Sequence, residues 1–125
     1  MIKIEIEKRN IEKNSIEEKI CNLSYLSKTV NGKKHLIIEI IDVFLKQVSE
    51  ELQSINDAID KTDYASIKNL THTMQSSVFI MGIAVLAPVL QEMENLGAST
   101  LNIEKIKDLN NKLNLICKQA IVEIQ

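Results

Sequence analysis

The feature that most constrains the fold is the spacing of apolar residues between Lys33 and about Asp60. These residues recur at steps of three and four positions, which places them along one face of a helix. The stripe consists of Leu36, Ile37, Ile40, Ile41, Phe44, Leu45, Val48, Leu52, Ile55 and Ile59. The sequence therefore predicts one long amphipathic helix over this range.

Residues that break regular structure are rare in this chain. Its 125 residues include 3 Gly and 1 Pro, with 45% hydrophobic but only 3% aromatic residues. The core must then be built from aliphatic side chains with few positions for tight turns, which favours long helices over a β-sandwich or barrel. The length suits one domain that buries most of its apolar surface, and is too short for two ordinary domains.

Four further helices are predicted from caps and apolar spacing. A short first helix opens at Ser15, where Glu18 three residues later completes a capping box, and it ends before Tyr25. A helix from about Asp63 to Met81 stops at Gly82, which is expected in the left-handed conformation. The next covers about residues 84–96 and ends at a break signal formed by Gly97, Ser99 and Thr100. Pro88 fits this helix only if it lies in about the first turn, where the missing N–H matters least. The last helix runs from about 102 to 124. The expected fold class is all-α: an antiparallel four-helix bundle with a short additional N-terminal helix.

The N-terminal residues do not fit the helical pattern. Ile2, Ile4 and Ile6 alternate as in a strand, but no second strand is available to pair with them. This segment could be disordered, extend the first helix, or pair with another chain. We therefore divide the sequence into an N-terminal extension of undetermined structure, residues 1–14, and a helical-bundle domain, residues 15–125.

Charge and hydropathy exclude several classes of function. A formal net charge of -2 and a pI near 5.7 give no basic surface for nucleic acid or an anionic membrane. No apolar run approaches the roughly 20 residues that span a bilayer, and residues 1–10 lack the apolar centre of a signal peptide. We expect a cytoplasmic protein. Cys21 and Cys117 have neither zinc nor redox spacing and are expected to be reduced core residues, which would pair only in an exported chain.

The helix over residues 63–81 places one histidine away from its apolar stripe. With about 100° of rotation per residue, Ile67, Leu70, Thr71, Met74, Val78 and Met81 face the core, whereas His72 points about 140° away from Ile67. Lys68, Gln75, Ser76 and Phe79 share the strip with His72. The small side chain of Ser76 would let another protein approach the imidazole closely. Phe79 offers an apolar side chain for a partner to bind. An idle surface histidine and a Phe79 that packs on a neighbouring helix are the simpler alternatives.

The segment Ala65-Ser66-Ile67-Lys68-Asn69-Leu70-Thr71-His72-Thr73-Met74-Gln75-Ser76-Ser77, with Gly82 ten residues after the histidine, resembles the signature of histidine-containing phosphotransfer (HPt) domains. In that signature a phospho-accepting His is followed by a basic residue at the third position, a small residue at the fourth and Gly at the tenth. The resemblance extends over about residues 15–120. It departs from the family at Gln75, which replaces the usual basic residue that helps to hold the phosphoryl group. Lys68, one turn before His72, could partly substitute for it.

The resemblance implies a phosphorelay intermediate of bacterial two-component signalling. His72 would accept a phosphoryl group from a receiver-domain aspartate and pass it to another receiver, with Gln75, Ser76, Lys68 and Phe79 supporting the phosphoryl group or the partner. The receiver is expected to supply an acidic pocket, Mg²⁺ and a Lys. This chain would be a phosphohistidine carrier rather than an enzyme, a monomer with no cofactor or metal of its own. It contains no glycine-rich phosphate loop, so no ATP-dependent kinase activity is expected.

Three alternatives remain open at this stage. A non-catalytic adaptor could bind a receiver without phosphotransfer, and Gln75 is the feature that supports it. A plain oligomerisation module would need a second apolar stripe, which the sequence does not show. A metal-dependent hydrolase is weaker still, because His35 and His72 lack acidic residues at ligand spacing.

Overall fold

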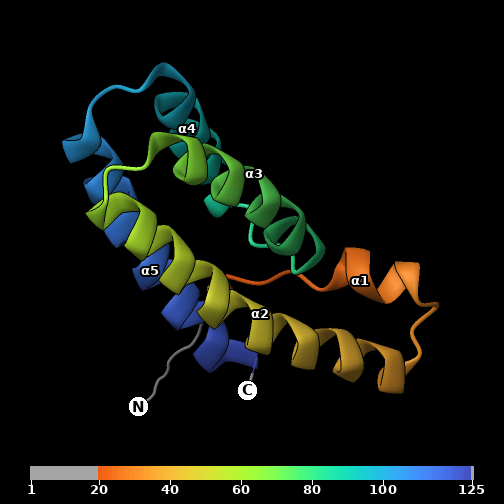
Figure 1. Ribbon diagram of the computed structural model, residues 1–125. Helices are drawn as coiled ribbons and strands as arrows, with labels where there is room; N and C mark the ends of the chain where they lie inside the picture. The colour runs from red at the N-terminus through yellow and green to blue at the C-terminus, as the bar shows by residue number, and fades with distance from the viewer. Residues whose placement is uncertain (1–19, 125) are drawn as a thin grey trace, which may run out of the picture.

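The structure is a computed structural model that describes residues 20–124, and within this range it is entirely helical outside the connections (Figure 1). The helices are α1 (Ser24–Thr29), α2 (Lys34–Asp60), α3 (Tyr64–Ile80), α4 (Leu86–Ser99) and α5 (Ile103–Ile124). The all-α prediction is confirmed. The predictions for the extension over residues 1–14 and for a helix start at Ser15 lie outside the described residues.

The four long helices form one bundle in which each packs against two others. α2 contacts α3 and α5, and α4 contacts the same two helices. The predicted stripe of α2 faces this core: Phe44, Val48, Ile55 and Ile59 are buried, and Ile37, Ile40, Ile41 and Leu52 pack against the buried cluster. The other helices contribute mainly aliphatic and sulfur-containing side chains, among them Ile67, Met74, Leu90, Met93, Ile106, Leu113 and Ala120.

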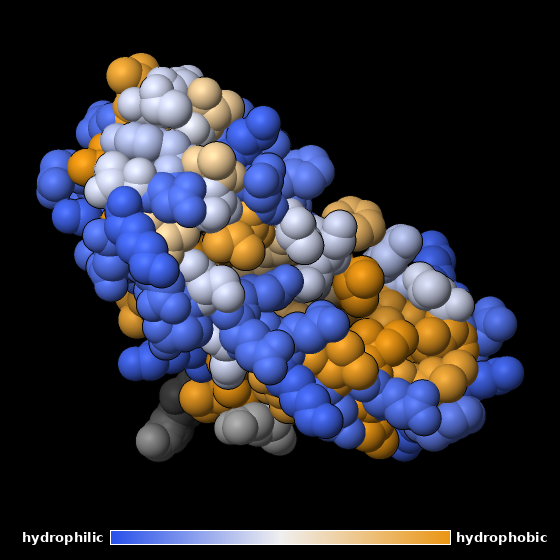
Figure 2. All heavy atoms as spheres, viewed as in Figure 1, coloured by the Kyte–Doolittle hydropathy of each residue, from blue (hydrophilic) through white to orange (hydrophobic). Residues whose placement is uncertain are grey.

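The first half of α2 is less completely covered than the second. Figure 2 shows a continuous hydrophobic area at the end of the molecule where α1 and the start of α2 lie. Ile38 and Val43 are 57% and 51% exposed there. The short helix α1 covers part of this end by burying Leu26.

The ends of α3 agree with the sequence analysis. The Asp63 carboxylate accepts hydrogen bonds from the backbone N–H of Ser66 at 3.2 Å and from its hydroxyl at 2.7 Å, which caps the helix. These hydrogen bonds lower the pKa of Asp63 below its ordinary value. Gly82, just beyond the other end, has a φ of +66°, the left-handed conformation predicted for it. These features define where α3 begins and ends.

The predicted first helix is wrong over the residues that the structure describes. Ile20, Cys21, Asn22 and Leu23 form a non-helical segment, which we call the strap, and α1 begins only at Ser24. The backbone N–H groups of the strap donate to residues that are distant in the sequence. The N–H groups of Ile20 and Cys21 donate to the Glu123 carboxylate, and that of Asn22 donates to the carbonyl of Gly82. The Asn22 side chain then accepts from the N–H of Ser24 and starts the helix. Most of these contacts join residues that are distant in the sequence, so they could not be predicted from capping signals among neighbouring residues.

The predicted boundaries of α4 also needed correction. The helix begins at Leu86 and runs through Gly97 to Ser99, where the left-handed Thr100 (φ 53°) ends it. Gly97 is therefore a helical residue and not a break. Because α4 begins at Leu86, Pro88 is its third residue and lies in the first turn, where the missing N–H is tolerated.

Both cysteines are buried and unpaired, as expected from the sequence. Burial raises the pKa of the Cys21 thiol to about 12, and the nearby Glu123 carboxylate adds to the effect. Burial, followed by the charge of Glu51, likewise raises the pKa of Cys117 to about 12. Within residues 20–124, no helix combines the length and the apolar character needed to cross a membrane.

We expect Gly82→Ala to destabilise the fold strongly. The left-handed conformation costs a non-glycine residue about 1–2 kcal/mol. The new Cβ would also lie 1.9 Å from the carbonyl oxygen of Asn22 in the strap. Urea unfolding should therefore show a loss of more than about 2 kcal/mol. Gly32→Ala is the matched control, because Gly32 has a similar φ of +68° but its Cβ would meet only Ser27 Oγ at 4.0 Å. Equal losses in both variants would contradict the close contact with the strap.

We expect Glu51→Gln to remove a loss of folding stability that the wild-type protein undergoes as pH rises. Glu51 Oε1 is buried without a hydrogen-bond partner among the described residues. Burial raises the pKa of Glu51 above its ordinary value of 4.5, and a hydrogen bond with Ser77 opposes this only in part. Glu51 therefore binds its proton more tightly in the folded state than in the unfolded chain. The stability that this tighter binding contributes is present below pH 4.5 and is lost as pH rises through the raised folded-state pKa.

Urea unfolding between pH 4 and 7 measures this effect. The stability of Glu51→Gln relative to wild type should increase with pH and reach about 1 kcal/mol, the low end for an unpaired buried acceptor in a partly screened position. Glu50→Gln changes the exposed neighbouring carboxylate and should have the pH dependence of wild type. A Glu51→Gln curve parallel to wild type would refute the assignment.

Candidate functional site

His72 lies on the outer face of α3, and its side chain is 69% exposed. Ile67, Thr71 and Met74 on the opposite face are fully buried, which confirms the predicted orientation of the helix. The buried Thr71 hydroxyl is satisfied by donating to the carbonyl of Ile67 at 2.7 Å. The core face of α3 therefore holds the imidazole at the surface, where another molecule can reach it.

A carboxylate on the neighbouring helix orients the imidazole. Nδ1 of His72 lies 3.1 Å from Oε2 of Glu94 in α4. An ionised carboxylate can only accept hydrogen bonds, so Nδ1 must carry the proton of the neutral ring. Nε2 then bears the free lone pair. The contact with Glu94 thus selects the tautomer and leaves Nε2 as the available nucleophile.

Gln75 holds the second oxygen of the same carboxylate. Its amide Nε2 donates to Glu94 Oε1 at 2.8 Å, while Oε2 faces His72. The Glu94 side chain is only 20% exposed, so both of its oxygens are fixed in a partly shielded position. Gln75 therefore orients the residue that orients His72, and it brings no charge to the site.

The close approach of α3 and α4 is made possible by Gly97. A Cβ at Gly97 would lie 3.0 Å from the backbone nitrogen of Lys68 and 3.1 Å from the carbonyl oxygen of Tyr64. Any larger residue would push the two backbones apart. Glu94 precedes Gly97 by about one turn, and His72 follows Lys68 by one turn, so this backbone contact brings the carboxylate to the imidazole.

An uncharged groove opens beside this site. Its lining comes from the strap, α1, α3, the α3–α4 connection and α4, and contains Asn22, Ser24, Tyr25, Gln75, Ser76, Val78, Phe79, Ile80, Gly82, Ile83, Ala84, Ala87, Pro88 and Gln91. No residue of this lining carries a charge, although 26% of the chain is charged. Gln75 contributes to both the groove and the histidine site, so the two are continuous.

Two aromatic rings stand on the groove. Tyr25 of α1 and Phe79 of α3 contact edge to face, with ring centroids 4.9 Å apart and planes inclined by 60°. They remain 50% and 63% exposed. Phe79 therefore does not pack into the bundle, and its neighbour comes from the short helix α1. Such a pair presents a rigid apolar surface to a partner.

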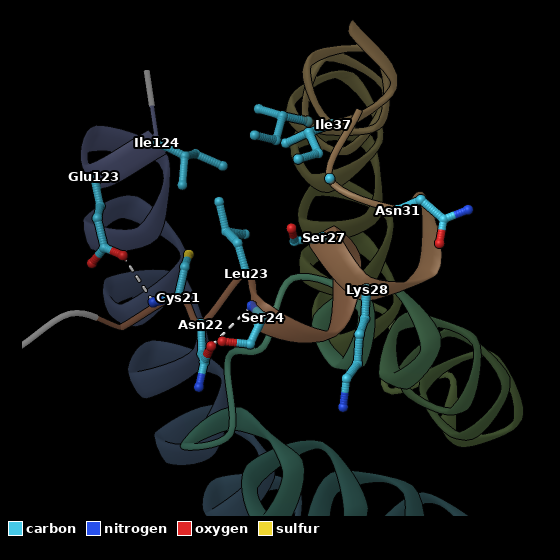
Figure 3. A pocket seen from close by; sticks show the side chains of 12 residues that line it. Cys21, Asn22, Leu23, Ser24, Ser27, Lys28, Asn31, Ile37, Glu123 and Ile124 are labelled. Carbon is cyan, nitrogen blue, oxygen red and sulfur yellow. Dashed lines mark hydrogen bonds between the residues drawn. The ribbon is translucent and has the colours of Figure 1, made fainter. Parts of the chain in front are cut away.

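A second hollow lies on the other side of the strap (Figure 3). It is bordered by α1, the start of α2 and the end of α5, and contains the Glu123 carboxylate that binds the strap. None of the residues predicted for the functional site lines it. Its only thiol, Cys21, is buried and has the raised pKa described above.

The structure brings His72, Gln75, Ser76 and Phe79 to one surface, in agreement with their shared helical strip. Lys68 is exposed one turn before His72, and its backbone forms the contact with Gly97. Sequence reasoning did not assign roles to Glu94 and Tyr25, because both reach the site from other helices. Among residues 20–124, no group of three His, Cys, Asp or Glu side chains is placed to hold a metal ion.

Comparison with known proteins gives one match. The family model described as Hpt domain matches residues 39–119, more than half of the chain, and the match includes His72 and Glu94. The searches of curated proteins and of solved structures gave no significant match.

Proposed function

The chain belongs to the Hpt domain family, and from this we propose that it is a phosphorelay intermediate that accepts a phosphoryl group on His72 from a receiver-domain aspartate and passes it to another receiver. Hpt domains take part in the histidine phosphotransfer of two-component phosphorelays and are carriers rather than kinases.

The observation that carries the proposal is the position of the exposed His72 ring, whose Nδ1 lies 3.1 Å from Oε2 of Glu94. With the proton on Nδ1, as argued above, the free lone pair is on Nε2. A nucleophile for phosphoryl transfer needs an accessible lone pair and a fixed direction of approach, because catalysis of this reaction is mostly positioning and charge stabilisation. His35 has no comparable bonding among the described residues.

We propose that the groove receives the apolar surface of the receiver. Its uncharged lining favours an uncharged partner surface, and the Tyr25–Phe79 pair supplies large exposed rings of the kind that dominate interface energies. Docking there would bring the receiver's active site over His72. The receiver would supply Mg²⁺ and the positive charge that Gln75 does not provide, and both proteins would act in the cytoplasm.

An adaptor that binds a receiver without accepting phosphate is the second candidate. One observation favours it: the Gln75 amide is committed to Glu94, so this position provides no cation for a phosphoryl group. The adaptor would use the same groove but would not need His72.

We expect phosphate on His72 when the protein is incubated with aspartate-phosphorylated receiver domains and Mg²⁺. The label should be stable in base and labile in acid, and mass spectrometry should place it on His72. His72→Gln should abolish labelling, whereas His35→Gln, the matched change at the other histidine, should leave it unaltered. Tight binding of a receiver without labelling would reject the carrier in favour of the adaptor.

We expect Phe79→Ser to weaken receiver binding at least about tenfold, since truncating an aromatic anchor costs about 1.4 kcal/mol or more. The dissociation constant can be measured by titration with a labelled receiver. Leu115→Ser is the matched control: Leu115 is 58% exposed but lies on α5, which does not line the groove. Equal weakening by both substitutions would show that the groove is not the docking surface.

A further inference from the structure

We propose that residues 1–19 of this chain bind in the second hollow, between α1, the start of α2 and the end of α5, and hold the strap and α1 in place. The inference concerns a different surface from the proposed function and can be tested without a receiver. Three observations carry it. The hollow exposes apolar side chains, the described chain begins at its rim, and Ile2, Ile4 and Ile6 alternate with charged residues.

The hollow presents aliphatic side chains that the bundle does not fully cover. Figure 3 shows three of them turned toward the same space: Leu23 of the strap, Ile37 of α2 and Ile124 of α5. These three and Ile41 pack against the core on one side, yet they remain only half-buried. The hollow lies at the end of the molecule that carries the continuous hydrophobic area of Figure 2. An apolar area of this kind is typical of a binding surface.

The described chain begins at the rim of this hollow. Ile20 is its first residue, and the backbone N–H of Ile20 donates at 2.7 Å to Oε1 of Glu123, which lines the hollow. Residues 1–19 are therefore joined to the molecule beside the hollow. An extended chain covers about 3.3 Å per residue, so the residues between Ile6 and Ile20 can span roughly 45 Å. This is far enough for Ile6 to reach any part of the hollow.

The covalent connection decides which occupant the hollow takes. A segment tethered at the rim has an effective concentration on the order of millimolar, so even a weak affinity keeps it bound. A second copy of the chain at micromolar concentration would have to bind about a thousandfold more tightly to compete. Charge does not oppose binding, because residues 1–19 contain as many basic as acidic residues and the lining of the hollow offers one of each sign, Lys28 and Glu123.

The alternation over residues 2–7 suits a surface that is apolar on one side and open to water on the other. In an extended segment, successive side chains point to opposite sides. Ile2, Ile4 and Ile6 would then contact the hollow, while the charged residues between them stay in water. An isolated extended segment cannot bury its own apolar face, and the hollow supplies the surface that it needs.

Occupation of the hollow would also stabilise the groove on the other side of the strap. Asn22 and Ser24 line both the hollow and the groove, and Tyr25 follows Ser24 directly. Tyr25 contacts Phe79 with ring centroids 4.9 Å apart, so an interaction that holds the strap also holds this aromatic pair. Residues 1–19 would thus act as an internal ligand that maintains one wall of the groove.

A nitroxide label at position 5 tests where the segment lies. Position 5 is charged and lies between two of the isoleucines, so the label would not replace a side chain that contacts the hollow. The introduced thiol of Glu5→Cys can be labelled selectively. Cys21 and Cys117 are buried, and their pKa values, raised to about 12, leave little reactive thiolate.

We expect the label to broaden the methyl NMR signals of Ile37, Ile41 and Ile124 at low protein concentration. Ile103, at the other end of α5 and about 30 Å from Ile124, should be much less affected. Equal effects at both ends, or none at either, would overturn the inference. A mixed sample of isotope-labelled wild type and nitroxide-labelled protein without isotopes detects contacts between molecules. Equally strong broadening in that sample would place a second copy in the hollow and would also overturn the inference.

Two sets of substitutions separate the apolar face of the segment from its charged face. Together, Ile2→Ser, Ile4→Ser and Ile6→Ser should abolish the preferential broadening near the hollow. The matched set, Lys3→Gln with Glu7→Gln, should retain it. Broadening that persists in the serine set, or that is lost equally in both sets, would contradict binding through the isoleucines.

Hydrogen exchange shows whether the segment holds the strap. The backbone N–H groups of Cys21 and Asn22 are hydrogen-bonded to Glu123 and Gly82. In the serine set without the label they should exchange at least about tenfold faster, because burial of a single Ile side chain is worth more than this factor. Exchange at Met74 in α3 should stay the same, which verifies that the bundle is folded. Unchanged exchange in the strap would overturn the inference.

Discussion

The backbone contact between α3 and α4 at Gly97 is the constraint on which the functional surface depends. A histidine that is held at the surface by one helix has no fixed ring orientation unless a second helix reaches it. Here the absence of a side chain at Gly97 lets α4 approach the backbone of Lys68, and the next turn of each helix then meets at His72 and Glu94. The buried stripe of α3 keeps the imidazole on the surface of the helix. The contact at Gly97 places Glu94 next to it. Packing in the core thus determines the tautomer of an exposed residue.

The charge distribution around His72 fits the proposed function, in which the chemistry is shared between two proteins. This chain offers the lone pair of the His72 ring, the Glu94 carboxylate beside that ring and an uncharged groove. A phosphoryl group that is being transferred needs nearby positive charge. With Gln75 committed to Glu94, that charge must come mainly from the docked partner. Under the proposed function, the isolated chain would have little means of stabilising a phosphoryl group during transfer, which would limit loss of phosphate to water between partners.

Helices whose apolar residues repeat regularly could be predicted from the sequence, and features made by distant residues could not. The extents of α2, α3 and α5 and the outward position of His72 follow from spacing and caps within each helix. The strap was missed because its donors pair with Glu123 and Gly82, which are far away in the chain. Gly97 was read as a break because its packing against Lys68 has no local signal. No role could be assigned to Glu94 for the same reason, because its contact with His72 exists only once α3 and α4 lie side by side.

The attachment of the strap has a consequence for the order in which the molecule assembles and opens. One wall of the groove, α1 with Tyr25, is tied down by hydrogen bonds that join positions 20 and 21 to position 123, among the longest chain separations in the fold. Loops of that length close late, after the local pairings between successive helices. Releasing α1 while the four-helix core stays folded costs these hydrogen bonds and the burial of Leu26. The histidine site and the α1 wall of the groove therefore have separate stabilities, and a molecule can keep His72 and Glu94 in contact after the groove has lost this wall.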